Sequence, residues 1–223
     1  MKKLFIILFA TLMLTGTSYA GSFGIGVSGS LAKVAAEGTE TTTAGSVAGG
    51  TADKHSKSVD ETSGIGSVFV DYQFDNGFVI GISHVPGSAD VSGKTHSRSE
   101  TAQGVSGTDA SGAVVRTADA EVENFNTIYV EMPLGNFFGK LGYAQIDVNT
   151  MENAITNSGT YGNATLDGVT VGAGVNAELG DFYTKTSVEY TDFEDLGLTS
   201  TTSNKITADL DVLEFKISLG KRF

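Results

Sequence analysis

Apolar and polar residues alternate with a period of two in eight separate stretches of this chain. Successive side chains of an extended strand point to opposite faces, so this period predicts strands with one apolar and one polar face. The predicted strands cover residues 22–31, 64–74, 78–85, 122–132, 137–148, 168–179, 182–191 and 212–223. The sequence therefore predicts an all-β protein with eight strands.

The alternation is clearest in 168–179, where the odd positions from Val169 to Leu179 are all Val, Ala or Leu. The even positions of this stretch are Gly, Thr, Asn or Glu. In 137–148 the pattern is less regular, because Ile146 and Val148 fall on the face that is otherwise polar. We expect a bulge or an early strand end at that point.

The connections between the predicted strands alternate in length. Those near 75–77, 133–136 and 179–181 are short, and the first contains Asn76-Gly77, the strongest short hairpin signal. Those at 32–63, 86–121, 149–167 and 192–211 are long and rich in Gly, Ser, Thr and Asp. Short turns at one end and long loops at the other are typical of antiparallel up-and-down transmembrane barrels.

A soluble β-sandwich also has short strands with alternating residues. Other features must therefore decide whether the strands are surrounded by water or by lipid. Ionisable residues lie well inside the predicted strands, and in a narrow barrel they would face the lumen and pair with one another. Aromatic residues gather at the short-turn ends, where rings favour the headgroup region of a bilayer. The predicted lumen-facing charges are Asp71, Glu131, Lys140, Glu178, Lys185, Glu189, Glu214, Lys216 and Arg222. The predicted interfacial aromatics are Tyr72, Phe74, Phe78, Phe137, Phe182 and Phe223.

The first twenty residues have the features of a secretory signal peptide. Lys2 and Lys3 precede an apolar run, and Ser18 and Ala20 occupy the small-residue positions before a cleavage site. The run is too short for a membrane-spanning helix, which needs roughly 20 apolar residues. We therefore expect residues 1–20 to be removed and residues 21–223 to form the barrel. The chain has no Cys, which excludes a lipid-anchored lipoprotein, disulfides and thiolate metal sites.

The C-terminal stretch places Leu213, Phe215, Ile217 and Leu219 on one face and ends on Phe223. This pattern resembles the closing strand of bacterial outer-membrane barrels, and the mature chain is similar in size and layout to the OmpA-type and OmpX-type eight-stranded, porin-family barrels. The resemblance implies the outer membrane of a Gram-negative bacterium, contact with its lipid and lipopolysaccharide, and four extracellular long loops. It also implies recognition by the barrel-insertion machinery through the strand that ends at Phe223. We expect a monomer.

Residues able to carry chemistry are present but not grouped. A net charge of −12 argues against a nucleic-acid partner. The three His residues, His55, His84 and His96, have no metal-ligand spacing, and no Ser lies in a G-x-S-x-G elbow. We therefore expect no cofactor and no enzymatic activity. Carboxylates that flank the last long loop could bind Ca²⁺, although a solvated acidic loop is the favoured interpretation: Asp192, Glu194, Asp195, Asp209 and Asp211.

Three functions stay open. The first is a structural or surface-exposed outer-membrane protein without a catalytic site. The second is a narrow porin-like channel for water, ions or small solutes, although an eight-stranded barrel is just wide enough for its own side chains. Gly172, Gly174 and Gly220 would open space in the lumen, which we expect long Lys, Glu and Arg side chains to refill. The third is an adhesin or surface-binding module that acts through loops 32–63 and 86–121.

Overall fold

The structure is a computed structural model that describes residues 21–41, 54–90, 96–101, 113–152, 160–201 and 203–223. The predicted signal peptide lies outside these residues. None of the described residues belongs to a helix long and apolar enough to cross a membrane. The strands are β1 (Gly21–Thr41), β2 (Lys54–Phe74), β3 (Val79–His84), β4 (Ser88–Asp90), β5 (His96–Thr101), β6 (Ala113–Leu134), β7 (Phe137–Glu152), β8 (Ala164–Leu179), β9 (Phe182–Phe193), β10 (Leu196–Thr199) and β11 (Lys205–Arg222).

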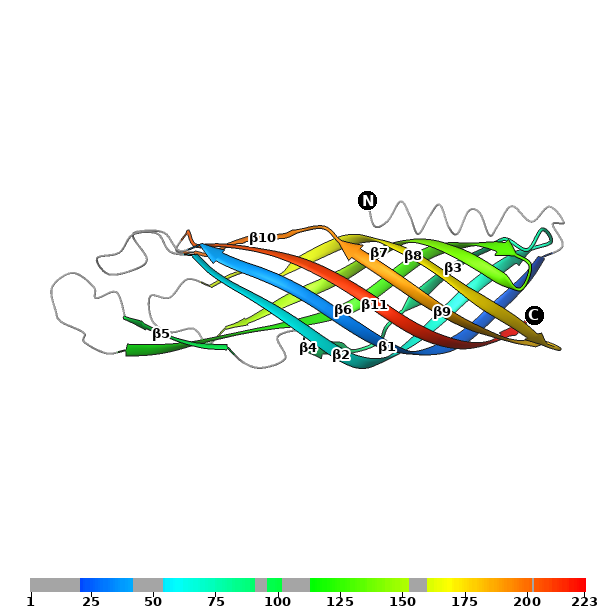
Figure 1. Cartoon of the computed structure of the whole chain (residues 1–223), viewed down its shortest axis with the longest axis horizontal. Coiled ribbons are helices and arrows are strands. Elements are labelled where there is room, and N and C mark those ends of the chain that lie inside the picture. Colours follow the sequence, from blue (N-terminus) through cyan, green and yellow to red (C-terminus); the bar gives the residue numbers. More distant parts are fainter. Residues whose placement is uncertain (1–20, 42–53, 91–95, 102–112, 153–159, 202) are drawn as a thin grey trace.

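Eight strands form a closed ring in the order β1, β2, β3, β6, β7, β8, β9 and β11, and all neighbours in it are antiparallel. The ring closes because β11 pairs with β1 from Gly24 against Arg222 to Thr41 against Lys205. The shorter β4 and β5 pair with β6, and β10 pairs with β11. Figure 1 shows the strands winding obliquely around one long axis. The predicted eight-stranded antiparallel up-and-down β-barrel is thus confirmed.

The three predicted short turns are also confirmed. They join β2 to β3, β6 to β7 and β8 to β9. In the first turn the Asn76 side chain accepts a hydrogen bond from the backbone N–H of Phe78 at 3.1 Å. Gly77 has a φ of 83° and Gly135, in the second turn, a φ of 70°, a conformation that glycine adopts without steric cost. All three turns lie at the same end of the barrel as residues 21 and 223.

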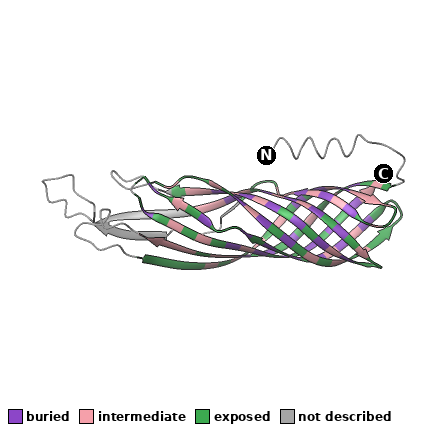
Figure 2. Cartoon of the chain, turned by 90° about the horizontal axis from the view of Figure 1, so that it is seen from above, coloured by how far each residue is buried: buried purple, intermediate pink, exposed green. Residues whose placement is uncertain are grey.

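At this end, which we call the short-turn half, the strands have an apolar outer face. The half covers residues 21–31, 66–74, 78–84, 126–134, 137–143, 169–179, 182–190 and 213–223, and we call its outward side chains the outer band. Leu31, Val169 and Ile217 of this band are 62%, 53% and 55% exposed. Inward residues such as Ser67, Thr170 and Ser218 are polar and buried. Apolar side chains therefore face outward and polar ones inward, which is the arrangement of a barrel in lipid. Figure 2 shows the alternation of buried and exposed positions along the strands.

Above this level, in the loop half, the polarity of the two faces is reversed. An apolar core fills the interior of the loop half: Ala32, Val34, Val122, Phe125, Ala144, Ile146, Val148, Leu166, Phe193, Leu196, Leu210 and Val212. The outward positions here are polar, for example Lys33, Asp147 and Asp211. This half therefore has the face pattern of a soluble protein, although it continues the same strands.

The reversal explains the irregular pattern of β7 and corrects our expectation there. Ile146 and Val148 are buried on the same inner face as Lys140 and Ala144. The pairing of β7 with β8 runs without a register shift from Phe137 to Val148. The expected early end is therefore wrong, because the alternation changes where the outer face of the strand changes from apolar to polar. A bulge does lie at this point in the β6–β7 ladder, opposite Ile146, but its extra residue belongs to β6. The one register shift in the described ladders lies in β6, between Glu123 and Asn126.

The same reversal makes the predicted boundaries of the long loops wrong. β1 and β2 stay paired from Gly21 against Phe74 to Thr41 against Lys54, so most of 32–63 is strand. Likewise 86–121 contains β4, β5 and the beginning of β6. Polar residues on the outer face do not end a strand that faces water, so the Ser-rich and Thr-rich composition concealed these extensions.

Candidate functional site

Four charged side chains from four strands meet in the lumen near the short turns, and we call them the lower charge cluster: Asp71, Glu131, Lys185 and Arg222. Asp71 is 1% exposed. It accepts hydrogen bonds from Lys185 Nζ at 3.1 Å and from Arg222 Nη1 at 3.2 Å. Lys185 also donates to Glu131 at 2.6 Å, and the Tyr183 hydroxyl donates to Asp71 at 3.0 Å. Two carboxylates thus balance two cations.

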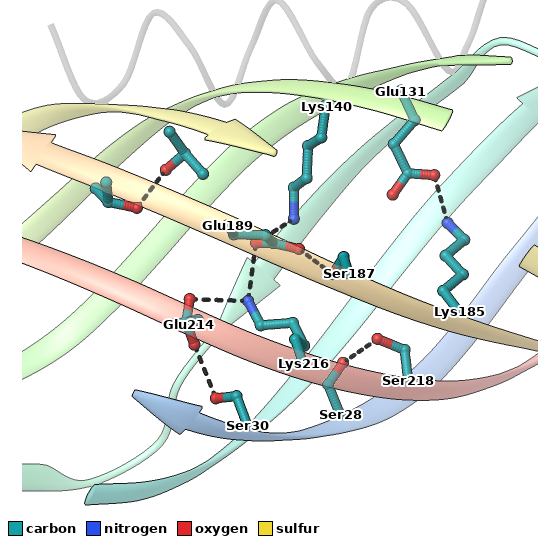
Figure 3. A network of polar contacts seen from close by, with 12 residues as sticks. Ser28, Ser30, Glu131, Lys140, Lys185, Ser187, Glu189, Glu214, Lys216 and Ser218 are labelled. Atoms are coloured by element: carbon teal, nitrogen blue, oxygen red, sulfur yellow. Dashed lines mark hydrogen bonds and ion pairs between the residues drawn. The ribbon is translucent and has the colours of Figure 1, made fainter. Parts of the chain in front are cut away.

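Further along the lumen lies the upper charge cluster: Lys140, Glu189, Glu214 and Lys216. Glu189 accepts from Lys140 Nζ at 2.8 Å and from Lys216 Nζ at 3.0 Å. Lys216 also donates to Glu214 at 3.0 Å, and Ser30 on β1 donates to the other oxygen of Glu214 at 2.8 Å. Figure 3 shows these contacts reaching across the lumen from β7, β9, β11 and β1. This cluster is also balanced, as buried charges require.

The two clusters adjoin, because Glu131 of the lower one and Lys140 of the upper one are direct partners in the β6–β7 ladder. Paired hydroxyls extend the polar zone: Thr170 with Thr191 and Ser28 with Ser218, each at 2.8 Å. Above them the apolar core begins. The ion pairs and hydroxyl pairs therefore lie in the lumen of the short-turn half, and apolar side chains fill the loop half. Among the buried side-chain N and O atoms of the described residues, Arg222 Nε has no hydrogen-bond partner.

Glu178 is the one predicted lumen charge that belongs to neither cluster. It is the register partner of Tyr183, so it lies on the inner face, but its side chain is exposed. β8 ends at Leu179, which places Glu178 at the mouth of the barrel rather than within the lumen. The alternation identified its face correctly, but it did not indicate its depth.

Four aromatic rings in or near the lumen were not predicted as site residues. Each belongs to a residue whose direct partner on the next strand is a glycine: Phe69 with Gly26, Tyr129 with Gly81, Phe138 with Gly174, and Tyr183 with Gly220. A Cβ at Gly174 would lie 2.6 Å from Phe138 Cζ, so the ring occupies the space that the glycine leaves. Rings therefore fill the spaces at Gly174 and Gly220, where we expected charged side chains, whereas the Glu189 side chain packs against Gly172.

Cations in the lumen also contact these rings. Lys140 Nζ lies 4.2 Å from the centroid of the Tyr129 ring, and Arg222 Cζ lies 4.1 Å from that of Tyr183. Both distances are within the range of cation–π attraction. The rings thus pack against glycines and also contact the cations of both clusters. The four ring–glycine pairs follow from the register of the strands. The alternation of apolar and polar residues does not give that register, so the sequence pattern alone could not identify the pairs.

The six predicted interfacial aromatics lie at the short-turn end of the barrel. Phe137, Phe182 and Phe223 are 63%, 50% and 70% exposed. The rings of Tyr72 and Phe74 contact each other edge to face, with 5.0 Å between their centroids. At the opposite edge of the outer band lie Tyr143 and Tyr190, which are not among the predicted interfacial aromatics. The Tyr190 hydroxyl donates to Asp211 at 2.8 Å, so its polar end points to the water side.

The histidines and loop carboxylates do not form a site in the described part of the chain. His84 Nδ1 lies 2.8 Å from Asn126 Oδ1, His55 is exposed, and the side chain of His96 is outside the description. Within the described residues no group of three or more His, Asp or Glu is placed to hold a metal ion. Asp209 has a pKa above its usual value because it shares a hydrogen bond with Asp195 and is repelled by that carboxylate.

Connections at the mouth of the loop half contact one another. The Tyr161 hydroxyl donates to Glu40 at the end of β1 at 2.8 Å. Thr160 and Thr201 exchange two hydrogen bonds at 3.2 Å, one from each backbone N–H. Segments far apart in the sequence are thereby joined above the apolar core.

No family model matches the chain. No curated protein matches it either. Among solved structures it is similar to the outer-membrane protease OmpT of Escherichia coli, with 10% identity, 94% of this chain and 99% of that chain covered, and a TM-score of 0.42. It is also similar to Neisserial surface protein A, with 9% identity, 92% of this chain and 99% of that chain covered, and a TM-score of 0.42. A third similar structure is Ail, the attachment invasion locus protein of Yersinia pestis, with 13% identity, 88% of this chain and 97% of that chain covered, and a TM-score of 0.37. These similarities carry no information on activity.

Proposed function

We propose that this chain is an integral outer-membrane protein of a Gram-negative bacterium with a structural or surface-exposed role, and that its barrel is sealed rather than conducting. The observation that carries the proposal is the filling of the interior. Glu189 and Glu214 are 4% and 2% exposed, and their ion pairs span the lumen below a continuous apolar core. An ion passing through would have to displace both layers, which is costly in a medium of low dielectric constant.

In this proposal the short turns face the periplasm and the long loops face outward. Lipid and lipopolysaccharide surround the outer band, and the insertion machinery recognises the strand that ends at Phe223. The protein acts as a monomer and has no catalytic activity. The closed antiparallel ring supports the monomer, because it leaves no unpaired edge in the short-turn half for a second copy to pair with.

Planar-bilayer recording tests whether the barrel is sealed. Refolded protein should give no reproducible conductance steps, whereas a general diffusion porin recorded in the same bilayers gives them. Glu189→Gln provides a matched variant, since it changes the charge at the centre of the lumen while keeping its shape. Steps in the unmodified protein whose ion selectivity changes in Glu189→Gln would establish the channel instead.

A surface-binding role is the alternative that one observation favours. β1 and β2 stay paired well beyond Leu31 and Gly64, so their ends at Thr41 and Lys54 lie far from the outer band. The test is deletion of 42–53 and of 102–112, because the longer deletions 32–63 and 86–121 would remove core residues such as Val34. Binding to host cells that survives both shorter deletions would contradict this role.

A further inference from the structure

The outer band contains a single Lys, Arg, Asp or Glu among the described strand residues, and this residue is Lys221. Its neighbours on the same face, Leu219 in β11 and Phe223 directly after this strand, are apolar and exposed. The register partner of Lys221 on β9 is Phe182, another exposed residue of the outer band. A lone cation on a surface that faces lipid needs an explanation, because charge in that position is costly except near the headgroups.

Two aromatic rings hold the Lys221 ammonium at the short-turn rim. Its Nζ lies 5.0 Å from the centroid of the Phe223 ring and 5.9 Å from that of Phe182. Phe223 is fixed in turn, because its backbone exchanges hydrogen bonds with that of Phe23 on β1, one of them at 2.8 Å. Within the described residues no carboxylate pairs with Lys221, in contrast to Lys33, which contacts Asp60 at 3.0 Å.

We propose that Lys221 binds the phosphate of an anionic phospholipid in the leaflet that faces the short turns. The rim of aromatic rings marks the headgroup level, and a bilayer places phosphates at that level. An ammonium without a protein carboxylate is free to pair with a phosphate, and the long side chain of lysine reaches outward from the apolar surface. Phe182 and Phe223 limit the positions that the ammonium can take.

Lipid selectivity in vesicles tests the proposal. The refolded protein is placed in phosphatidylcholine vesicles with either spin-labelled phosphatidylglycerol or spin-labelled phosphatidylcholine, and the immobilised fraction of each is measured. The unmodified protein should favour phosphatidylglycerol about fivefold, the size expected for one basic residue at a membrane surface. Lys221→Gln should abolish the preference and Lys221→Arg should keep it.

Lys33→Gln is the matched control, because Lys33 is exposed but lies in the loop half and has its own carboxylate partner. It should leave the preference unchanged. Free inorganic phosphate added to the buffer should not reduce the preference, since the aromatic rim favours a lipid-borne phosphate. A preference for phosphatidylglycerol that persists in Lys221→Gln overturns the proposal. Conductance is a separate readout, so the result is independent of whether the barrel is sealed.

Discussion

The phenol ring of Tyr183 lies over Gly220, its direct partner across the β9–β11 ladder. A Cβ at residue 220 would lie 2.7 Å from Tyr183 Cε1, closer than such contacts allow. Tyr183 is 1% exposed and donates its hydroxyl to Asp71, so the ring cannot move aside without breaking the lower charge cluster.

Gly220→Ala should therefore destabilise the barrel by about 1–3 kcal/mol, the usual cost of adding a methyl group to a filled interior. The measurement is the urea concentration at which the compact form is lost in a gel mobility assay. Gly29→Ala is the control, because nothing lies within 4 Å of a Cβ at that outward glycine. Equal effects of the two variants would show that backbone flexibility matters rather than the space under the ring.

Glu189→Ala should be among the most destabilising single changes in the lumen. It removes the carboxylate that joins Lys140 to Lys216, and Lys140 has no other ion-pair partner among the described residues. Breaking a buried pair costs about 3–5 kcal/mol, because it leaves an uncompensated charge. The exposed pair of Lys33 and Asp60 provides the comparison, and Asp60→Asn should change the unfolding free energy by about 0–1 kcal/mol.

The reversal of face polarity along β7 predicts a pattern of chemical labelling. The chain has no Cys, so single cysteines report their own positions. In protein embedded in vesicles, a water-soluble maleimide should label Asp147→Cys, which is outward in the loop half. It should not label Leu141→Cys, which faces lipid, or Val148→Cys, which is buried in the apolar core. Rapid labelling of Leu141→Cys would show that the membrane boundary lies closer to the short turns than residue 141, which would contradict this prediction.

Acidification should strengthen the contact of β10 with β11. The pKa of Asp209 is raised by its hydrogen bond with Asp195, by repulsion from that carboxylate, and by Glu37 and Asp211 nearby. The folded protein therefore binds this proton more tightly than the unfolded chain, so local stability rises as pH falls through the raised pKa and is lost again as pH rises. The amide hydrogen exchange rate of Leu198 in β10, corrected for the intrinsic rate at each pH, measures this local stability. Asp209→Asn should remove the pH dependence, and a persistent dependence would implicate another group.

The sequence predicted the short-turn half well because that half lies in a single medium. With lipid outside, the period-two pattern identifies the face of every residue from Val169 to Leu179, and the turn at Asn76-Gly77 gives the end of β2. The strands of the loop half were not predicted, because the face that is polar in the short-turn half becomes apolar there. The ring–glycine pairs were missed because they depend on register, which joins residues as distant as Tyr183 and Gly220.

The switch from a polar to an apolar interior within single strands has a consequence for how deeply the protein is immersed. A barrel with one uniform exterior can slide along the bilayer normal at little cost. Here an inward displacement would carry Asp147 and Asp211 into hydrocarbon, and an outward one would carry Leu31 and Leu213 into water. The strands that run through both halves therefore encode their own vertical position, without help from any connecting segment.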